Sequence, residues 1–234
     1  MANDTMTSVR SLFPVLSGDD SSAASFSAAD RVILLTHNPT DNSSADVYSL
    51  IKKETGAEKI FRLSVFLTSK GKLLFTAPAG PDMNSCLEDL EFCVKAGLPL
   101  IQNLGISPKI GLISGGRAGD LGRNVTVDQT ITDAEALEKK LAAVGISAKH
   151  YTILIEDAVK EANFLILPDS LSGEMILKSV AGIGEGIEVG NILLLKAPAG
   201  MTIQNDKIYI EQLTKKADFK NAEILREALI LSFK

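Results

Sequence analysis

The residues best suited to bind a ligand lie in one glycine-rich loop, Ser114–Arg123, which follows the apolar run Lys109–Ile113. Its four glycines allow backbone N–H groups to approach a bound group, and its two arginines can pair with a phosphate or carboxylate through two hydrogen bonds each. In open α/β sheets, ligands bind beyond the carboxyl ends of the strands. We therefore expect an anion to contact Ser114, Gly115, Gly116, Arg117, Asp120 and Arg123. The alternative is a loop that only turns the chain, with solvated arginines.

Two further polar segments follow predicted strands. Glu156 and Asp157 come after the run 151–155, and Pro168–Gly173 comes after the run 163–167. Because parallel strands end at the same edge of a sheet, both segments are expected to converge with the glycine-rich loop. Carboxylates can act as general bases, so the predicted catalytic residues are Glu156, Asp157 and Asp169, and the additional ligand-binding residues are Ser170, Ser172 and Gly173. As an alternative, these side chains cap helices and bind no ligand.

Other candidate residues give weaker signals. Gly182–Gly186 resembles a cofactor-binding turn, but it follows a predicted helix and leads into a strand, which is the wrong context. Neither His37 nor His150 has an obvious partner in the sequence, so no catalytic role is assigned to either. Cys86 and Cys93 lack the spacing of a metal or redox motif and are expected to be partly buried thiols in a reducing compartment. No metal site is predicted.

Composition narrows the function further. The chain has 234 residues and a formal net charge of −5, without a basic stripe, which argues against a nucleic-acid partner. No apolar run approaches the roughly 20 residues that span a bilayer, so a soluble, cytoplasmic protein is expected. Residues 1–29 are rich in Ser, Ala and Asp and are expected to be poorly ordered or loosely attached.

Apolar periodicity predicts an α/β fold, with any domain boundary around residues 77–82 or along the helix that follows. The predicted strands cover residues 31–36, 60–68, 72–76, 109–113, 151–155, 163–167 and 191–195, the second and third forming a hairpin. The predicted helices cover residues 45–55, 87–101, 132–144, a stretch beginning at Ser170, and 222–233. Pro99 is expected to kink or split the second of these helices. The capping box Thr132–Glu135 is expected to begin the third helix, and Gly145 to end it.

Several motifs resemble a known superfamily, that of the phosphate acetyl- and butyryltransferases. They are Ile106–Ser114, Ala162–Asp169, Gly173–Lys178 and Gly190–Ile192, which match it in order and spacing. A closer resemblance is to MtxX, a methanogenesis-marker family described as methyltransferase-related. It rests on Thr76–Asp82, Ser114–Arg117, Asp120, Gly122–Arg123, Val127–Asp128, Asp133–Glu135 and Ile153–Asp157, and covers roughly residues 35–197.

The resemblance implies a two-lobed, phosphotransacylase-like (isocitrate/isopropylmalate dehydrogenase-like) sheet fold with crossover helices, often a dimer, with a ligand cleft between the lobes. The first lobe would be shortened and cover residues 30–82, and the α/β lobe that carries the glycine-rich loop would cover residues 83–234. The resemblance also implies an archaeal, methanogenic setting. Two departures stand out. The segment Pro198–Asp206 contains no arginine where phosphotransacylases hold substrate with a Ser-Arg-Gly segment, and Glu174 replaces the usual Asn. Losing a cation that stabilises an anionic reaction centre would remove much of the acyl-transfer rate.

Four functions remain open. The first is a methyltransferase-related transferase that binds a phosphorylated or carboxylated, CoA-like or pterin-like ligand, with Arg117 and Arg123 clamping the anion and Asp169 with Glu156 orienting or deprotonating the acceptor. The second is a non-catalytic accessory or regulatory subunit that works beside methyltransferase subunits. A phosphate acyltransferase comes third, and a conventional S-adenosylmethionine enzyme comes last.

Overall fold

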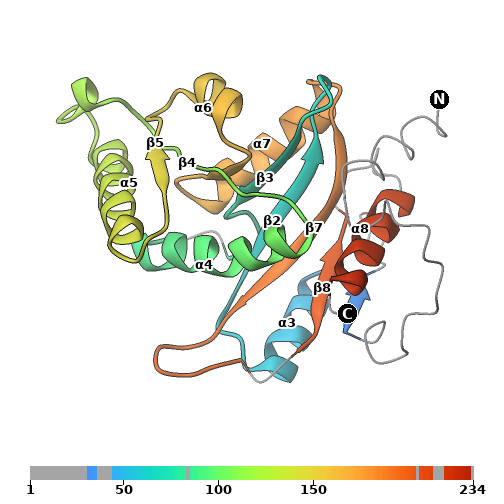
Figure 1. Cartoon of the computed structure of the whole chain (residues 1–234). Coiled ribbons are helices and arrows are strands. Elements are labelled where there is room, and N and C mark those ends of the chain that lie inside the picture. Colours follow the sequence, from blue (N-terminus) through green and yellow to red (C-terminus); the bar gives the residue numbers. More distant parts are fainter. Residues whose placement is uncertain (1–30, 36–43, 83–84, 204–205, 213–218, 233–234) are drawn as a thin grey trace.

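The computed structural model describes residues 31–35, 44–82, 85–203, 206–212 and 219–232. In this part of the chain, eight strands form one mixed sheet in the order β1-β8-β7-β2-β3-β6-β4-β5 (Figure 1). The strands are β1 (Val32–Leu34), β2 (Lys59–Leu67), β3 (Leu73–Ala77), β4 (Ile110–Leu112), β5 (Ala148–His150), β6 (Phe164–Ile166), β7 (Ile187–Lys196) and β8 (Ile208–Glu211). The helices are α3 (Ser44–Thr55), α4 (Leu87–Asn103), η2 (Ala118–Asp120), α5 (Val125–Ala143), α6 (Ile155–Glu161), α7 (Ser170–Gly182) and α8 (Phe219–Leu231).

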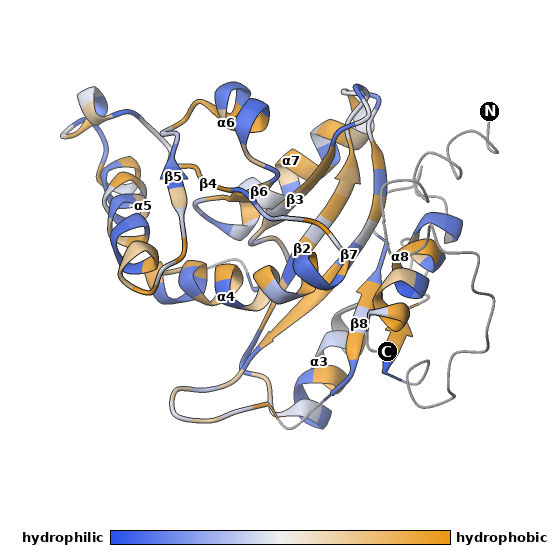
Figure 2. Cartoon of the chain, in the orientation of Figure 1, coloured by the Kyte–Doolittle hydropathy of each residue, from blue (hydrophilic) through white to orange (hydrophobic). Residues whose placement is uncertain are grey.

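Helices pack on both faces of the sheet. The side chains of β6 alternate between the two faces of the sheet: Phe164 and Ile166 lie in one core, and Leu165 lies in the other. Because both faces of this strand are apolar, each needs helices to cover it. The first core also contains buried side chains of α4, α5 and α8, whereas α6 and α7 contribute to the second core and α3 to a third. Figure 2 shows the apolar strands β2 and β7 in the middle and polar residues on the helices around them. The predicted α/β class is confirmed.

The hairpin prediction is also confirmed. β2 and β3 pair antiparallel, with Ser64 opposite Thr76, and the turn between them contains Gly71 at φ 76°. β2 also pairs with β7 along its length, from Lys59 opposite Lys196 onward. Strands from both predicted lobes therefore share a single sheet. The predicted N-terminal segment 1–29 lies outside the described residues.

Two predicted elements are misplaced along the chain. The strand placed at 151–155 is instead β5 at Ala148–His150, and Ile155 already begins α6. Helix α5 begins at Val125 and not at Thr132, because the side chain of Asn124 accepts hydrogen bonds from two N–H groups of the first turn. Thr132 lies inside that helix. Helix α4 is not split, since it continues through Pro99, and β8 was missed altogether.

Candidate functional site

Four chain segments leave the sheet side by side at one edge. β3, β6, β4 and β5 run parallel, and backbone hydrogen bonds join the residues at their ends. These bonds run from Leu167 N–H to Ala77 O (2.8 Å), from Ile113 N–H to Ile166 O (2.8 Å) and from Ser114 N–H to Thr152 O (2.9 Å). The glycine-rich loop after β4 and the segment 168–173 after β6 therefore begin at neighbouring positions, where α/β proteins bind ligands.

The glycine-rich loop uses several of its own backbone N–H groups. The donor and acceptor pairs are Gly115 to Thr130 Oγ1 (2.8 Å), Arg117 to Asp120 Oδ2 (2.9 Å) and Gly122 to Asp128 Oδ2 (3.0 Å). Close packing fixes the loop as well, because a Cβ on Gly116 would lie 2.7 Å from a methyl carbon of Val127. These three N–H groups thus already have acceptors within the protein.

The two arginines of the loop differ in their surroundings. Arg123 pairs with Asp120 through a 2.6 Å contact between Nη1 and Oδ1, with 74% of the arginine side chain exposed. Arg117 is exposed, and its guanidinium forms no ion pair with any described residue. Arg117 is therefore available to pair with an anion, whereas Arg123 would first have to give up its ion pair with Asp120.

Ser114 has a partner that the sequence did not reveal. Its side chain is buried, and Oγ lies 2.9 Å from both Gly116 O and His150 Nε2. His150 is the last residue of β5, and its backbone N–H donates to Glu138 Oε1 (3.0 Å). Burial lowers the pKa of His150. With the strand placed correctly, at 148–150, the sequence would have put this histidine at a strand end beside the loop.

In the segment after β6, the predicted catalytic residue Asp169 and the predicted ligand-binding residues hold the local structure together. Asp169 caps α7 by accepting a 2.7 Å hydrogen bond from Ser172 N–H. Ser170 is buried and donates to Asp82 O (2.9 Å). Gly173 is in such close contact that a Cβ would lie 2.0 Å from Pro78 O. The structure thus gives the capping alternative for Asp169 direct support.

Glu156 and Asp157 lie apart from the glycine-rich loop along the chain, in the first turn of α6, and both are exposed. Asp157 Oδ1 pairs with Lys160 Nζ at 2.7 Å. A cavity of about 510 Å³ opens beside this helix and β5. It is lined by Lys149, His150, Tyr151, Thr152, Leu154, Asp157, Lys160 and Glu161. His150 therefore connects this cavity to Ser114.

The unusual Glu174 has a structural explanation. Its carboxylate forms an ion pair with the buried Arg62, which also pairs with the fully buried Glu211. Tyr48 donates a 2.6 Å hydrogen bond to Glu211, and burial together with the charge of Glu211 raises the pKa of Tyr48. Burial, the largest single influence, would lower the pKa of Arg62, but Glu211, Tyr48 and Glu174 together outweigh it and raise that pKa. Glu174 thus balances a buried cation.

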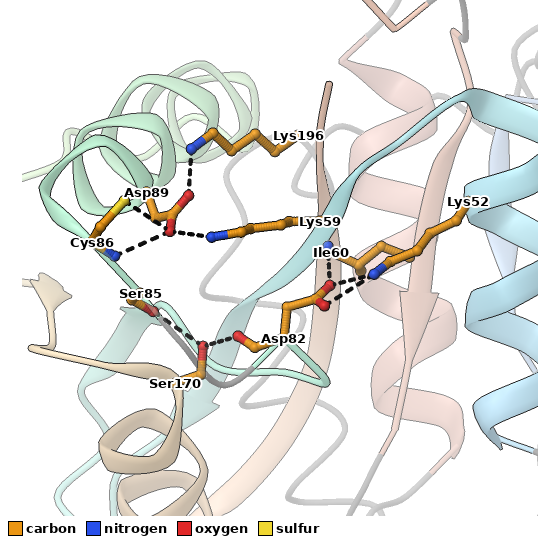
Figure 3. Close-up of polar contacts among 9 residues, drawn as sticks. All are labelled: Lys52, Lys59, Ile60, Asp82, Ser85, Cys86, Asp89, Ser170 and Lys196. Carbon is orange, nitrogen blue, oxygen red and sulfur yellow. Dashed lines mark hydrogen bonds and ion pairs between the residues drawn. The ribbon is translucent and has the colours of Figure 1, made fainter. Parts of the chain in front are cut away.

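A second polar cluster lies between α4 and the ends of β2 and β7 (Figure 3). Asp89, with 0% of its side chain exposed, pairs with Lys59 (2.7 Å) and with Lys196, and accepts a hydrogen bond from Cys86 N–H (3.1 Å). Burial would raise the pKa of Asp89, but the hydrogen bonds from Lys196 and Lys59 hold it at about 2.

Figure 3 also shows Asp82 reaching β2, where it accepts from Ile60 N–H (2.6 Å) and pairs with Lys52 (2.8 Å). Asp82 is the residue whose backbone oxygen accepts from Ser170, so this contact ties the start of α7 to the head of β2. Cys93 is buried and Cys86 is exposed. Among the described residues, no group of three or more His, Cys, Asp or Glu side chains is arranged to bind a metal.

The fold is that of phosphotransacylase-like α/β proteins. The structure superposes on a branched-chain phosphotransacylase from Enterococcus faecalis with a TM-score of 0.58 and 13% identity, covering 87% of this chain and 74% of that one. A phosphotransacetylase from Streptococcus pyogenes superposes with a TM-score of 0.59 and 15% identity, covering 86% of this chain and 61% of that one. A 4-hydroxythreonine-4-phosphate dehydrogenase from Klebsiella pneumoniae superposes with a TM-score of 0.52 and 11% identity, covering 87% of this chain and 64% of that one. At such identities the likeness concerns the fold alone.

Sequence comparison confirms the resemblance to the MtxX family that was drawn from the motifs. The chain is 38% identical over 179 residues to a protein of Methanosarcina barkeri named "Putative methyltransferase mtx subunit X", and 39% identical over 181 residues to its namesake in Methanosarcina mazei. The alignments cover 76% and 77% of this chain. They cover 63% and 61% of the relatives, so the chain spans somewhat over three fifths of their length. No protein-family model matches the chain.

The part of the chain that the structure describes has no helix long and apolar enough to cross a membrane.

Proposed function

We propose that this protein binds a phosphorylated or carboxylated ligand at the edge where β4 and β6 end, and that it does so as part of a methyl-transfer system in methanogenesis. The observation that carries the binding site is Arg117. Its exposed guanidinium has no ion pair among the described residues, and it lies three residues after the buried Ser114 at the end of β4. An unpaired guanidinium beside a strand end is suited to bidentate pairing with an oxyanion.

The link to methyl transfer comes from the relatives. Two Methanosarcina proteins that share 38% and 39% identity with this chain carry the name of a methyltransferase subunit. A protein of Methanocaldococcus jannaschii that is 29% identical, over 65% of this chain and 64% of its own length, is named an uncharacterized methyltransferase. The ligand is accordingly expected to be an anion of CoA-like or pterin-like chemistry, held in a cleft between the lobes.

Isothermal titration calorimetry with inorganic phosphate, CoA and methyl-tetrahydromethanopterin tests the site. Replacing Arg117 with Ala removes a charge-assisted hydrogen bond, which is worth roughly 1.5–3 kcal/mol, so we expect affinity to fall about ten- to hundred-fold. Lys139→Ala is the matched control, because Lys139 is an exposed cation on α5. If none of these compounds binds, or if Arg117→Ala binds as tightly as Lys139→Ala, the proposed site is wrong.

A non-catalytic accessory subunit is the second candidate, and the engaged carboxylates favour it. Asp169 is committed to the cap of α7 and Asp157 to Lys160, so two of the three predicted catalytic groups already have structural partners. Purification of the native complex distinguishes the two candidates. An accessory subunit co-purifies with methyltransferase subunits and shows no turnover when isolated. An assay with acetyl phosphate and CoA tests the third candidate, a phosphate acyltransferase.

A further inference from the structure

Three buried side chains in the middle of the sheet carry polar atoms without a hydrogen-bond partner. They are Ser64 on β2, Thr76 on β3 and Asn191 on β7, each with 0% of its surface exposed. Ser64 Oγ, Thr76 Oγ1 and Asn191 Oδ1 form no hydrogen bond with any described residue. Buried polar atoms of native proteins almost always have a partner, because an unpaired one costs about as much free energy as a lost hydrogen bond. These three atoms therefore require an explanation.

The three residues form one row across the sheet. Ser64 pairs with Thr76 on one side and with Asn191 on the other. Side chains at directly opposite positions of antiparallel strands point to the same face, with Cβ atoms about 4.5–5.5 Å apart. The oxygen of Ser64 thus has a polar neighbour on either side, close to it but beyond the reach of a direct hydrogen bond. We call these three residues the polar row.

Helix α7 covers the polar row. Side chains two residues apart on a strand share a face, and the neighbours of Thr76 on its face show where the helix lies. Leu74, two residues before it, shares a core with Leu177 of α7, and Pro78, two residues after it, is in close contact with Gly173 of α7. Thr76 thus lies under the turn between Gly173 and Leu177. Glycine and leucine have no polar side-chain atoms, and backbone groups inside a helix bond to one another, so this turn offers the row no partner.

The amide of Asn191 is oriented by its own hydrogen bonds. Nδ2 donates to Glu188 Oε1 (2.6 Å) and to Glu211 O (3.4 Å), so Oδ1 is directed away from Glu188. The row therefore presents one oxygen that can only accept and two hydroxyls that can both donate and accept. None of the three atoms carries a charge. This combination suits a neutral molecule that donates as well as accepts.

We propose that the polar row binds internal water, with one molecule bridging Ser64 Oγ to Thr76 Oγ1 and another bridging it to Asn191 Oδ1. Water is small enough for an enclosed site, and it can donate to an amide oxygen while it accepts from a hydroxyl. Ser64 has the smallest side chain of β2, so this strand leaves the most space under α7 at that position. The two bridges join three strands beneath the helix. This water site is independent of the proposed anion site at Arg117.

The sign of a stability change tests the proposal. Thr76→Val keeps the shape of the side chain and removes only its hydroxyl. A buried hydroxyl without any partner destabilises the fold, so its removal would raise the urea concentration at the midpoint of unfolding. A hydroxyl that binds water stabilises the fold, so its removal should lower the midpoint. We expect a lower midpoint, and a higher one would overturn the proposal.

Ser64→Ala tests whether the two hydroxyls share a water molecule. If they do, this change should shift the midpoint less in the Thr76→Val background than in the unaltered protein, because the bridge is already broken there. Thr55→Val is the matched control background, since the buried hydroxyl of Thr55 donates directly to Ile51 O (2.7 Å) on α3, outside the row. Ser64→Ala should keep its full effect in that background. Equal shifts in all three backgrounds would contradict the bridge.

A crystal structure of the unaltered protein locates the water directly. Electron density is expected within hydrogen-bond distance of Ser64 Oγ, toward Thr76 and toward Asn191. A direct bond between the two hydroxyls, or well-ordered side chains with no density between them, would overturn the proposal. A bound cation would overturn it as well. Its sign would be a midpoint that falls when choline replaces Na⁺ and K⁺ in the unaltered protein but not in Ser64→Ala.

Discussion

Replacing Asp89 with Asn should destabilise the protein by about 2–3 kcal/mol, because it removes a buried charge that two lysines share. Breaking a buried ion pair from one side costs about 3–5 kcal/mol. Here Lys59 and Lys196 keep 30% and 22% of their side chains exposed, so water can partly rehydrate the orphaned ammonium groups and reduce that cost. The pKa of Asp89 gives a similar magnitude, since a fall from 3.8 to about 2 corresponds to roughly 2 kcal/mol.

Urea unfolding across a range of pH measures this energy and its sign. Because folding lowers the pKa of Asp89, its contribution is fully present above about pH 4 and is lost as the pH falls toward 2. The difference in the free energy of unfolding between Asp89→Asn and the unaltered protein should therefore be largest near neutral pH and should shrink in acid.

Glu91→Gln is the matched control, because Glu91 lies on the same helix and also pairs with two lysines, at 2.6 and 3.2 Å. Those partners, Lys95 and Lys140, are 51% and 44% exposed, so the control should cost less than about 1 kcal/mol. The reasoning is refuted if Asp89→Asn costs no more than Glu91→Gln, or if its cost stays constant as the pH falls below 4.

Two further substitutions test the local structure. Gly173→Ala should destabilise the protein by about 3 kcal/mol or more, because the added Cβ would lie 2.0 Å from Pro78 O. Gly182→Ala is the control, since Gly182 is the last residue of the same helix and has open space around it, and this change should be neutral or stabilising. Equal melting temperatures for the two variants would contradict this expectation. Asn124→Ala should cost about 1 kcal/mol in urea unfolding, because two N–H groups of the first turn of α5 lose their acceptor, and Asn124→Ser should recover most of it; an unchanged midpoint in the Ala variant would argue against the cap.

Most of the sheet could be predicted because local pattern and tertiary packing agree there. The run after Lys59 alternates clearly enough, and the turn at Gly71 is short enough, for the hairpin to follow from the sequence. The segment 151–155 could not be assigned in this way, since a short apolar run fits a strand or a buried helix equally well. Thr152 turns the chain out of the sheet at φ 57°, and Ile155 then packs from α6.

The candidate site was predicted in part for the same reason. Ser114 and Arg117 stand out because glycines and charge follow an apolar run within a few residues. His150 and Ser114 are 36 residues apart, and no local pattern joins them. Arg62 did offer a signal, since a lone arginine within an apolar strand requires a buried counter-charge, but its partner Glu211 lies 149 residues further along the chain. Pairings over such separations require the topology.

The position of the β2–β3 hairpin in the sheet has a consequence for how the chain folds. The hairpin comes early in the sequence but lies in the middle of the sheet, where β2 pairs with β7 and β3 pairs with β6. The strands made after it form two blocks, β6-β4-β5 and β7-β8, which share backbone hydrogen bonds with the hairpin and not with each other. Lys59 cannot meet Lys196 until most of the chain has been synthesised. Such pairing between distant segments makes folding slow. Both edges of the hairpin therefore remain unpaired until β7 and β6 have been synthesised and can bind to them.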